Sequence, residues 1–425
     1  MKLHSLALVP VGLLLAGTAT AQSVLVVDAN NGPGTDHTQI QAAIDAAEEG
    51  DSLLVRTGSY DPFVVDGKSL TIQADTDALV QVLAGFVNPE APLLQVRNLG
   101  SGQHATIRGV ELRASFLGTA STIALVEDNL GTVWIEDLLV TPTFFFVLLP
   151  QAALTVEDST GVTVVRSTLP GSLQDNCGTC GSAPGLRATN SVVSVFDSTL
   201  SGSSGSNGVG SPGPTVGGPG ALVDGGRAFF SGCTLTGGDG GDAFLGQDGA
   251  DAGDGIRLIG PGPVVRALGT DFTGGSGGSG NGPGTNAGAD GEPSDVTSGS
   301  LTLLDGTART FSTLSPIRAG ADSYTETFTG EPGDVVVLAY SLTGPIPGVF
   351  LGVAKSDLVV APPLVLLAKG TLDASGVLTV TPPSTPLGTG LESLQVFLQG
   401  AVLSSTGEGV FLTSPGALLL VDPTF

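Results

Sequence analysis

The sequence is poor in basic, aromatic and sulfur-bearing side chains. Its 425 residues include 15 Lys and Arg against 40 Asp and Glu, with one Trp, three Tyr and three Cys. Nucleic-acid binding depends on Lys and Arg that neutralise phosphates, so no nucleic acid is expected as a partner. The same excess of negative charge disfavours uronic-acid polymers, unless calcium bridges them to the protein.

Long apolar runs are missing beyond the first residues. Residues 1–21 combine Lys2, the short apolar stretch Leu6–Leu15 and the small residues Ala19-Thr20-Ala21, which is typical of a cleaved signal peptide. No later run reaches about 18 uncharged apolar residues, so no membrane span is expected. These features predict a protein that is secreted or held at the cell surface.

Cysteine chemistry is correspondingly limited. Cys177 and Cys180, in the run CGTC, are candidates for a disulfide because the protein is expected to be exported. Two Cys are too few for a zinc site. Cys233 is left over and is expected to lie buried in the core, as free Cys often does.

Glycine and short apolar runs are plentiful, with 65 Gly, 27 Pro and 41% hydrophobic residues. One early stretch has helical periodicity: Ile40, Ala43, Ile44 and Ala47 recur at i, i+3, i+4 and i+7, which predicts a helix over 39–49 with a capping box at its start. The runs 53–56, 63–65 and 70–74 follow, separated by turn residues, and predict short strands. A helix ahead of stacked strands would cover the open end of a solenoid.

These residues also carry a resemblance. The runs 38–47, Gly50-Asp51, Gly58-Ser59-Tyr60 and 68–72 resemble the N-terminal signature of the pectin lyase-like family of right-handed parallel β-helices. The resemblance implies an all-β solenoid with an N-terminal capping helix. The family includes pectinesterases, lyases, hydrolases and proteins without known chemistry, so the resemblance does not fix an activity.

Repetition continues along the chain. The segments ATIRGVEL, TVWIEDLL, TVVRSTL, SVFDSTL, FFSGCTL and RALGTDF end at Leu112, Leu139, Leu169, Leu200, Leu235 and Phe272. Each interval predicts one coil of three short strands with an insertion, because a single coil cannot bury its apolar face alone. The insertions in 201–300 are Gly-rich and enter at the same point of successive coils, so they are expected to stack as a wing on one side.

Three interpretations of this wing remain open. Runs of Gly cost backbone entropy to order, which favours a flexible or loosely packed flap. A calcium site is the second interpretation, since carboxylates occur at short spacing among the glycines. Its candidate ligands are Asp239, Asp242, Asp248, Asp251 and Asp254. A wall that faces carbohydrate is the third.

No complete catalytic constellation is present. Trp134, the one Trp, could stack on a sugar ring, and with Glu136, Glu157 and Arg166 it forms the candidate carbohydrate-binding set. Glu136, Asp137, Glu157, Asp158 and Asp197 recur in neighbouring coils and could gather as glycosidase-type carboxylates. A lyase needs a base near an acidic substrate, and Arg108 and Arg166 could line such a groove. One Arg on each of two coils is also typical of a solvated face, which is the favoured interpretation.

The pattern changes near residues 310–318. Seven apolar runs separated by Pro, Gly and Asp turns predict an antiparallel β-sandwich. They are 324–328, 334–342, 349–353, 364–368, 376–380, 394–403 and 417–421. The run GTLDASGVLTVTPPSTP resembles C-terminal β modules of exported proteins from planctomycete-type bacteria.

The predicted organisation is a signal peptide at 1–21, a right-handed parallel β-helix at 22–312 and a β-sandwich at 313–425. The leading functional hypothesis is a noncatalytic protein that binds extracellular polysaccharide or cell-surface matrix. The alternative is a polysaccharide-active enzyme, of the lyase, glycoside hydrolase or pectinesterase type. No cofactor other than calcium is implied.

Overall fold

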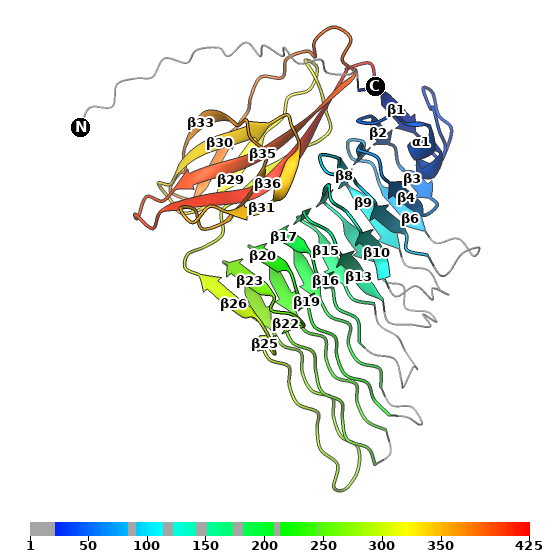
Figure 1. The fold of residues 1–425 in the computed structure, drawn as a ribbon, viewed down its shortest axis with the longest axis vertical. Helices are drawn as coiled ribbons and strands as arrows, with labels where there is room; N and C mark the ends of the chain where they lie inside the picture. Colours follow the sequence, from blue (N-terminus) through cyan, green and yellow to red (C-terminus); the bar gives the residue numbers. More distant parts are fainter. Residues whose placement is uncertain are drawn as a thin grey trace.

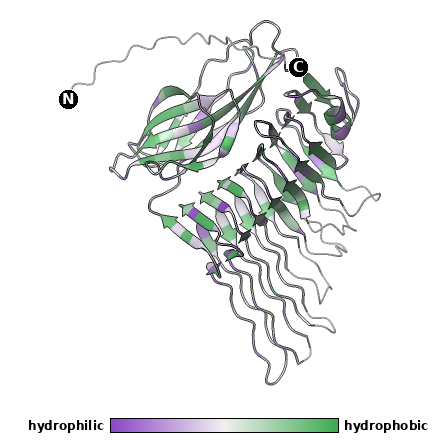
Figure 2. Cartoon of the chain, viewed as in Figure 1, coloured by the Kyte–Doolittle hydropathy of each residue, from purple (hydrophilic) through white to green (hydrophobic). Residues whose placement is uncertain are grey.

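The computed structural model describes residues 22–83, 91–113, 122–141, 151–172, 182–207, 213–244 and 246–425. A parallel β-solenoid runs through the first three hundred residues, and a C-terminal part made largely of antiparallel strands lies along its side (Figure 1). Hydrophobic residues concentrate in the strands of both parts (Figure 2). The predicted fold class, an all-β chain with a parallel β-helix, a capping helix and a sandwich-like C-terminal part, is confirmed.

Three parallel sheets form the solenoid, and each coil contributes one strand to each sheet. The first sheet contains β1 (Val24–Val27), β2 (Ser52–Val55), β5 (Leu70–Ala74), β8 (His104–Arg108), β11 (Thr132–Glu136), β14 (Val162–Val165), β17 (Val192–Phe196), β20 (Arg227–Ser231), β23 (Val264–Leu268) and β26 (Ser300–Leu304). The second contains β4 (Phe63–Asp66), β7 (Leu94–Arg97), β10 (Thr122–Glu127), β13 (Ala152–Glu157), β16 (Leu186–Thr189), β19 (Ala221–Asp224), β22 (Ile256–Ile259) and β25 (Ser294–Val296). The third contains β3 (Gly58–Tyr60), β6 (Val80–Leu83), β9 (Val110–Arg113), β12 (Leu139–Thr141), β15 (Thr168–Pro170), β18 (Thr199–Ser201), β21 (Thr234–Thr236) and β24 (Asp271–Thr273).

Two corners of each coil pass through residues with left-handed φ. Gly67, Asn98, Asp128, Asp158, Asn190, Gly225 and Gly260 stack at the corner from the second sheet to the first. Gly109, Asp137, Arg166, Asp197, Gly232 and Gly269 stack at the corner from the first sheet to the third. Gly, Asn and Asp adopt this conformation at low cost, whereas Arg166 (φ 47°) is an exception that calls for a reason elsewhere in the structure.

The N-terminal helix covers the open end of the solenoid, as expected. Helix α1 (Ile40–Ala46) buries Ile40, Ala43 and Ile44 in the solenoid core. Its predicted capping box is wrong, because no side chain caps its start. Its C-terminal carbonyls are instead bound by Lys68, whose Nζ donates to the carbonyls of Ile44 (2.9 Å) and Ala47 (2.6 Å).

One coil differs from the predicted register by one residue. Val140 pairs with Leu112 and is buried, whereas Leu139 is 43% exposed. Successive strand residues point to opposite faces, so a shift of one residue exchanges the inward and outward sets. Leu139, the expected end of that repeat, therefore faces outward.

The C-terminal part contains one three-stranded, one five-stranded and one two-stranded sheet. These are formed by β27 (Thr310–Thr313), β29 (Glu326–Thr329) and β34 (Val377–Val380); by β28 (Ile317–Arg318), β36 (Val410–Val421), β35 (Ser393–Leu403), β30 (Val335–Ser341) and β33 (Val365–Thr371); and by β31 (Pro345–Phe350) and β32 (Asp357–Val360). Strand β27 already belongs to this part, so the architecture changes between Leu304 and Thr310, a few residues before the expected boundary. In the described part of the chain, no helix is long and apolar enough to cross a membrane.

Candidate functional site

The outward face of the first sheet is covered by the C-terminal part. Trp134, Val165, Phe196, Phe229 and Leu268 lie on successive strands of that face and are buried with the C-terminal core in one hydrophobic cluster. Their inward neighbours in sequence belong to the separate solenoid core. We call this contact between the two parts the seam.

Trp134 is fully buried in the seam. Its ring packs edge-on against Phe397 of β35, with centroids 5.3 Å apart, and its Nε1 donates to Oε2 of Glu136 at 2.7 Å. The same Glu136 oxygen accepts the backbone N–H of Ala417 from β36 at 2.9 Å. Both side chains are 0% exposed, so the ring has no free face on which a sugar could stack.

Two arginines complete a charged cluster around Glu136. Arg108 lies within 3.2 Å of Glu136 Oε1, and Arg166 contacts the same oxygen. The Nε atoms of both arginines donate to Asp137, at 2.9 Å from Arg108 and 3.0 Å from Arg166. The Arg108 side chain is 6% exposed and that of Arg166 is 21% exposed, so the interpretation of these residues as a solvated face is wrong.

The cluster also binds the C-terminal backbone. Arg108 Nη1 donates to the carbonyl of Ala417 at 2.6 Å and Nη2 donates to that of Thr313 at 3.0 Å. Arg166 Nη1 approaches the carbonyl of Phe311 at 3.5 Å. These contacts give a physical reason for an arginine at the left-handed corner position 166, since it reaches across the seam where Gly or Asp could not.

The charges within the cluster balance. Two guanidinium groups face two carboxylates, those of Glu136 and Asp137. Burial alone would lower the pKa of Arg166, but the charges of Glu136 and Asp137 outweigh burial and raise that pKa above its usual value. Arg166 therefore stays protonated and is unsuited to act as a base.

Asp197 is the next residue in the corner stack. Burial raises the pKa of Asp197 to about 6, although a hydrogen bond from Ser414 and the charge of Arg166 act in the opposite direction. A carboxyl group with this pKa is partly protonated near neutral pH, which makes Asp197 one pH-sensitive group of the seam.

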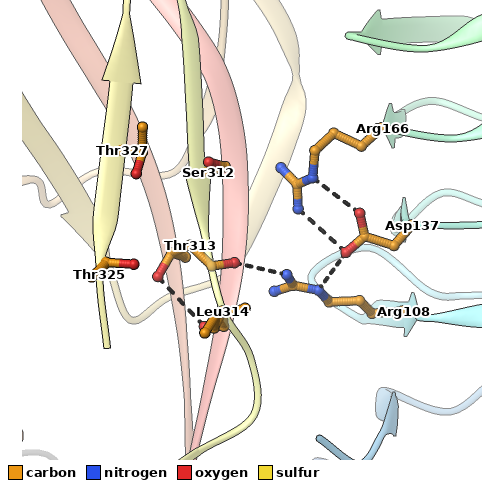
Figure 3. Close-up of a pocket in the computed structure, with 8 residues that line it drawn as sticks. All are labelled: Arg108, Asp137, Arg166, Ser312, Thr313, Leu314, Thr325 and Thr327. Carbon is orange, nitrogen blue, oxygen red and sulfur yellow. Dashed lines mark hydrogen bonds and ion pairs between the residues drawn. The ribbon is translucent and has the colours of Figure 1, made fainter. Parts of the chain in front are cut away.

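A cleft of about 300 Å³ opens beside the cluster, between the solenoid and the C-terminal part. The solenoid contributes Arg108, Asp137 and Arg166. Strands β27 and β29 and their flanking residues contribute Ser312, Thr313, Leu314, Thr325 and Thr327. The charged and hydroxyl groups face each other across this space (Figure 3).

The structure separates Glu157 from the other predicted site residues. Glu157 ends β13 in the second sheet, next to the equivalent Glu127 of the preceding coil. Glu136 ends β11 in the first sheet. The carboxylates expected to gather across neighbouring coils therefore fall on two different corners, with Glu157 and Asp158 on one and Glu136, Asp137 and Asp197 on the other.

The Gly-rich wing is ordered by hydrogen bonds with a period of three. It consists of segments 202–207, 213–220, 237–244, 246–255 and 274–293, which extend side by side from the coils (Figure 1). Gly237, Gly240 and Ala243 donate to the carbonyls of Thr273, Ser276 and Ser279 in the next coil. A donor at every third residue is typical of extended helices of the polyproline II type, which have three residues per turn and no internal hydrogen bonds.

Glycine is required because the segments touch through their backbones. Gly238 and Gly241 donate to the carbonyls of Gly218 and Thr215, which brings the outgoing segment of one coil against the returning segment of another. A Cβ added at Gly238 or Gly241 would overlap the backbone carbonyl of Ser203 or Ser206 in the outgoing segment of the preceding coil. The expectation of a flexible or loosely packed flap is wrong, since these contacts supply the ordering that Gly runs otherwise lack.

The five aspartates of the wing share one structural role. The Oδ1 atoms of Asp239, Asp242, Asp248, Asp251 and Asp254 accept the backbone N–H groups of Ser276, Ser279, Asn286, Ala289 and Glu292, at 2.6 to 3.0 Å. Each aspartate thus bridges to the next coil. Across the described ranges, no three His, Cys, Asp or Glu side chains gather in a group that could hold a metal ion, so the calcium hypothesis finds no cluster there.

The structure describes one of the three cysteines, Cys233. Cys177 and Cys180, the candidate disulfide, lie outside the described residues. Cys233 is free and buried in the solenoid core, as predicted. Its Sγ contacts the carbonyls of Val195 and Ser231, each at 3.5 Å.

Comparison with known proteins identifies no close relative. No protein-family description matches the chain, and no curated protein sequence matches it. A solved pectate lyase, Pel9A, is 12% identical over 63% of this chain and 78% of its own, with a TM-score of 0.30. The enzymatically active domains of tailspike proteins 2 and 4 of bacteriophage CBA120 are each 10% identical, over 88% and 87% of this chain and 72% and 64% of their own, with TM-scores of 0.25. These similarities are too low to inform the site, so its interpretation rests on its own geometry.

Proposed function

We propose that this chain is a secreted, noncatalytic β-helix protein of the pectin lyase-like type that presents its surface to extracellular carbohydrate or matrix. One observation carries the proposal: the charged side chains that converge on the seam are paired with one another and with the C-terminal backbone. A lyase or hydrolase needs a base or nucleophile that is free to reach substrate. The paired cluster offers none.

The third sheet supports a binding role. Thr168, Thr199 and Thr234 lie in register on its outward face, and all three are exposed. The outgoing wing segments continue this face with exposed Asp239 and Ser276. Hydroxyl groups in a row suit a polar, hydroxyl-rich partner, because each hydroxyl can exchange its hydrogen bonds with water for bonds to the ligand.

A panel of polysaccharides tests the proposal. Purified full-length protein is incubated with neutral and anionic polymers, with calcium or with a chelator, and retention on the polymer and release of soluble product are both measured. We expect retention on at least one polymer without product, and no requirement for calcium. Release of oligosaccharides that is lost on replacing Arg166 or Glu157 would establish the enzymatic alternative instead.

A further inference from the structure

The seam cleft has one rigid wall. Arg108 is held by four contacts, to Asp137, Glu136 and the carbonyls of Ala417 and Thr313. A guanidinium group has five N–H donors. The four contacts of Arg108 use four of them, and one N–H donor remains. Arg166 is fixed in the same way by Asp137, Glu136 and Phe311. Donors fixed before a ligand arrives lose little entropy on binding.

The opposite wall carries hydroxyl groups. Ser312, Thr325 and Thr327 line the cleft, and their side chains form no hydrogen bond to any described residue. The neighbouring Thr313 hydroxyl, in contrast, contacts the carbonyl of Leu314 at 3.4 Å. Hydroxyl groups that can both donate and accept therefore face the fixed guanidinium groups (Figure 3).

Charge and size restrict what the cleft could hold. Its arginines are balanced by Asp137 and by Glu136 behind it, and the whole chain carries a net charge of -25, so an anion gains little there. A volume of about 300 Å³ lies at the lower end for ligand sites. None of the described residues that line the cleft is aromatic, so recognition would depend on hydrogen bonds at the ligand's edges.

We infer that the seam cleft is a binding site for one neutral, hydroxyl-rich sugar unit, held between the guanidinium groups of Arg108 and Arg166 and the hydroxyls of Ser312, Thr325 and Thr327. This inference rests on the proposed function and assigns it a location. Recognition by hydrogen bonds alone, in a site open to water, predicts weak binding with a Kd on the order of 1 mM.

The test uses the full chain and a pair of hydroxyl-to-methyl substitutions. Thr325→Val with Thr327→Val removes two cleft hydroxyls while keeping β-branched side chains in and beside β29. Thr371→Val, an exposed position of β33 away from the cleft, is the matched control. Binding of glucose, galactose, mannose and N-acetylglucosamine is measured by ligand-observed NMR, with glucuronate and sulfate as the anionic arm.

We expect at least one neutral sugar to bind the wild type, the double variant to bind it at least tenfold more weakly, and Thr371→Val to bind it unchanged. Unfolding midpoints should agree for all three proteins. No neutral binding to the wild type, unchanged binding by the double variant, or binding of the anions alone would each overturn the inference. Retention on polysaccharide separates the two proposals. If the double variant is retained as strongly as the wild type, the cleft assignment fails and the proposed function stands. If the wild type is not retained on any polymer, the proposed function itself fails.

Discussion

Glu136 connects more of the seam than any neighbouring carboxylate. Its two oxygens reach the indole of Trp134, the backbone of Ala417 and the guanidinium groups of Arg108 and Arg166. A buried carboxylate is tolerated when positive groups and hydrogen bonds surround it, and its removal leaves the partners uncompensated. Glu136 therefore joins the two parts of the chain rather than serving a ligand.

Replacement of this residue should show the size of that contribution. Glu136→Gln leaves two buried guanidinium groups with Asp137 as the remaining carboxylate, and we expect a loss of about 3 kcal/mol in the free energy of unfolding. Urea denaturation, followed by the fluorescence of the single Trp and by far-UV circular dichroism, measures this loss. The control is Glu157→Gln, whose half-buried carboxylate forms no ion pair with any described residue, and a change within about 0.5 kcal/mol is expected there. Equal effects of the two substitutions would contradict the assigned role.

Asp197 gives the seam a pH dependence. Burial raises the pKa of this carboxyl to about 6 in the folded protein, against 3.8 as its ordinary value. The folded state therefore holds the proton more tightly than the unfolded state. The contribution of Asp197 to the free energy of unfolding is present below pH 4 and is lost as the pH rises through 6. Asp197→Asn should leave stability near pH 4 unchanged and raise it at pH 8, by at most roughly 3 kcal/mol. Asn also suits the left-handed φ at this corner.

An exposed carboxylate with the opposite behaviour serves as the control. Hydrogen bonds from Ser375 and Val377 lower the pKa of Asp373, so its stabilising effect is present above the ordinary pKa and is lost in acid. Asp373→Asn should lower stability at pH 8 and have no effect in strong acid. If the free energy of unfolding of Asp197→Asn runs parallel to that of the wild type from pH 4 to 8, Asp197 does not titrate in this way.

At the scale of the element, the wing shows how segments without a hydrophobic core become ordered. Its stability comes from backbone contacts between glycines and from aspartates that bond to the next coil. Both kinds of contact repeat every three residues, in step with the turn of an extended helix. A side chain added at one of the glycines where segments touch through their backbones should therefore disturb several segments.

Gly240→Ala tests this arrangement, because the added Cβ would overlap the carbonyl of Ala250 on the returning segment. We expect hydrogen exchange at the amides of Gly241, Ala250 and Gly253 to accelerate at least tenfold, which corresponds to about 1.4 kcal/mol of local stability. Exchange in the strands of the first sheet should not change. Gly388→Ala is the control, since its Cβ would make ordinary contact with Leu391. Unchanged exchange in the Gly240 variant would mean that the wing segments are not in close contact.

At the scale of the whole molecule, the two parts share one hydrophobic cluster. Outward side chains of the first sheet and the core of the C-terminal part are buried together. Interfaces of this hydrophobic kind are typical of permanent rather than mobile domain contacts. The C-terminal part therefore occupies the face on which the predicted site residues Trp134, Glu136 and Arg166 lie.

Shared burial predicts that both parts respond to one seam substitution. Phe397→Ala removes the ring that packs on Trp134 and should destabilise the protein by about 3 to 5 kcal/mol. The fluorescence transition, which reports the seam, and the dichroism transition, which reports all strands, should shift together. Phe244→Ala, at a 46% exposed position of the wing, should shift neither. A shift of the fluorescence transition alone would indicate that the two parts unfold independently.

The sequence by itself determined the fold class, the capping helix, the stacked coils and the position of the wing. These features depend on local periodicity: a helical stripe at Ile40 and Ile44, short apolar runs, and insertions at equivalent points. The burial of Cys233 followed from the same pattern, because residues on the inward face of a coil have no other environment.

The tertiary structure decided that the outward face of the first sheet is covered, which charged side chains pair at the seam and how the Gly-rich wing is ordered. Trp134 packs against Phe397, Arg108 binds Ala417, which lies 309 residues further along the chain, and Asp239 bonds to a backbone N–H one coil later. No local pattern encodes such contacts, because alternation shows that a side chain points outward but not whether water or another domain lies there. A charge or a tryptophan on an outward face could therefore be located from the sequence, while its role depended on the distant segment that packs against it.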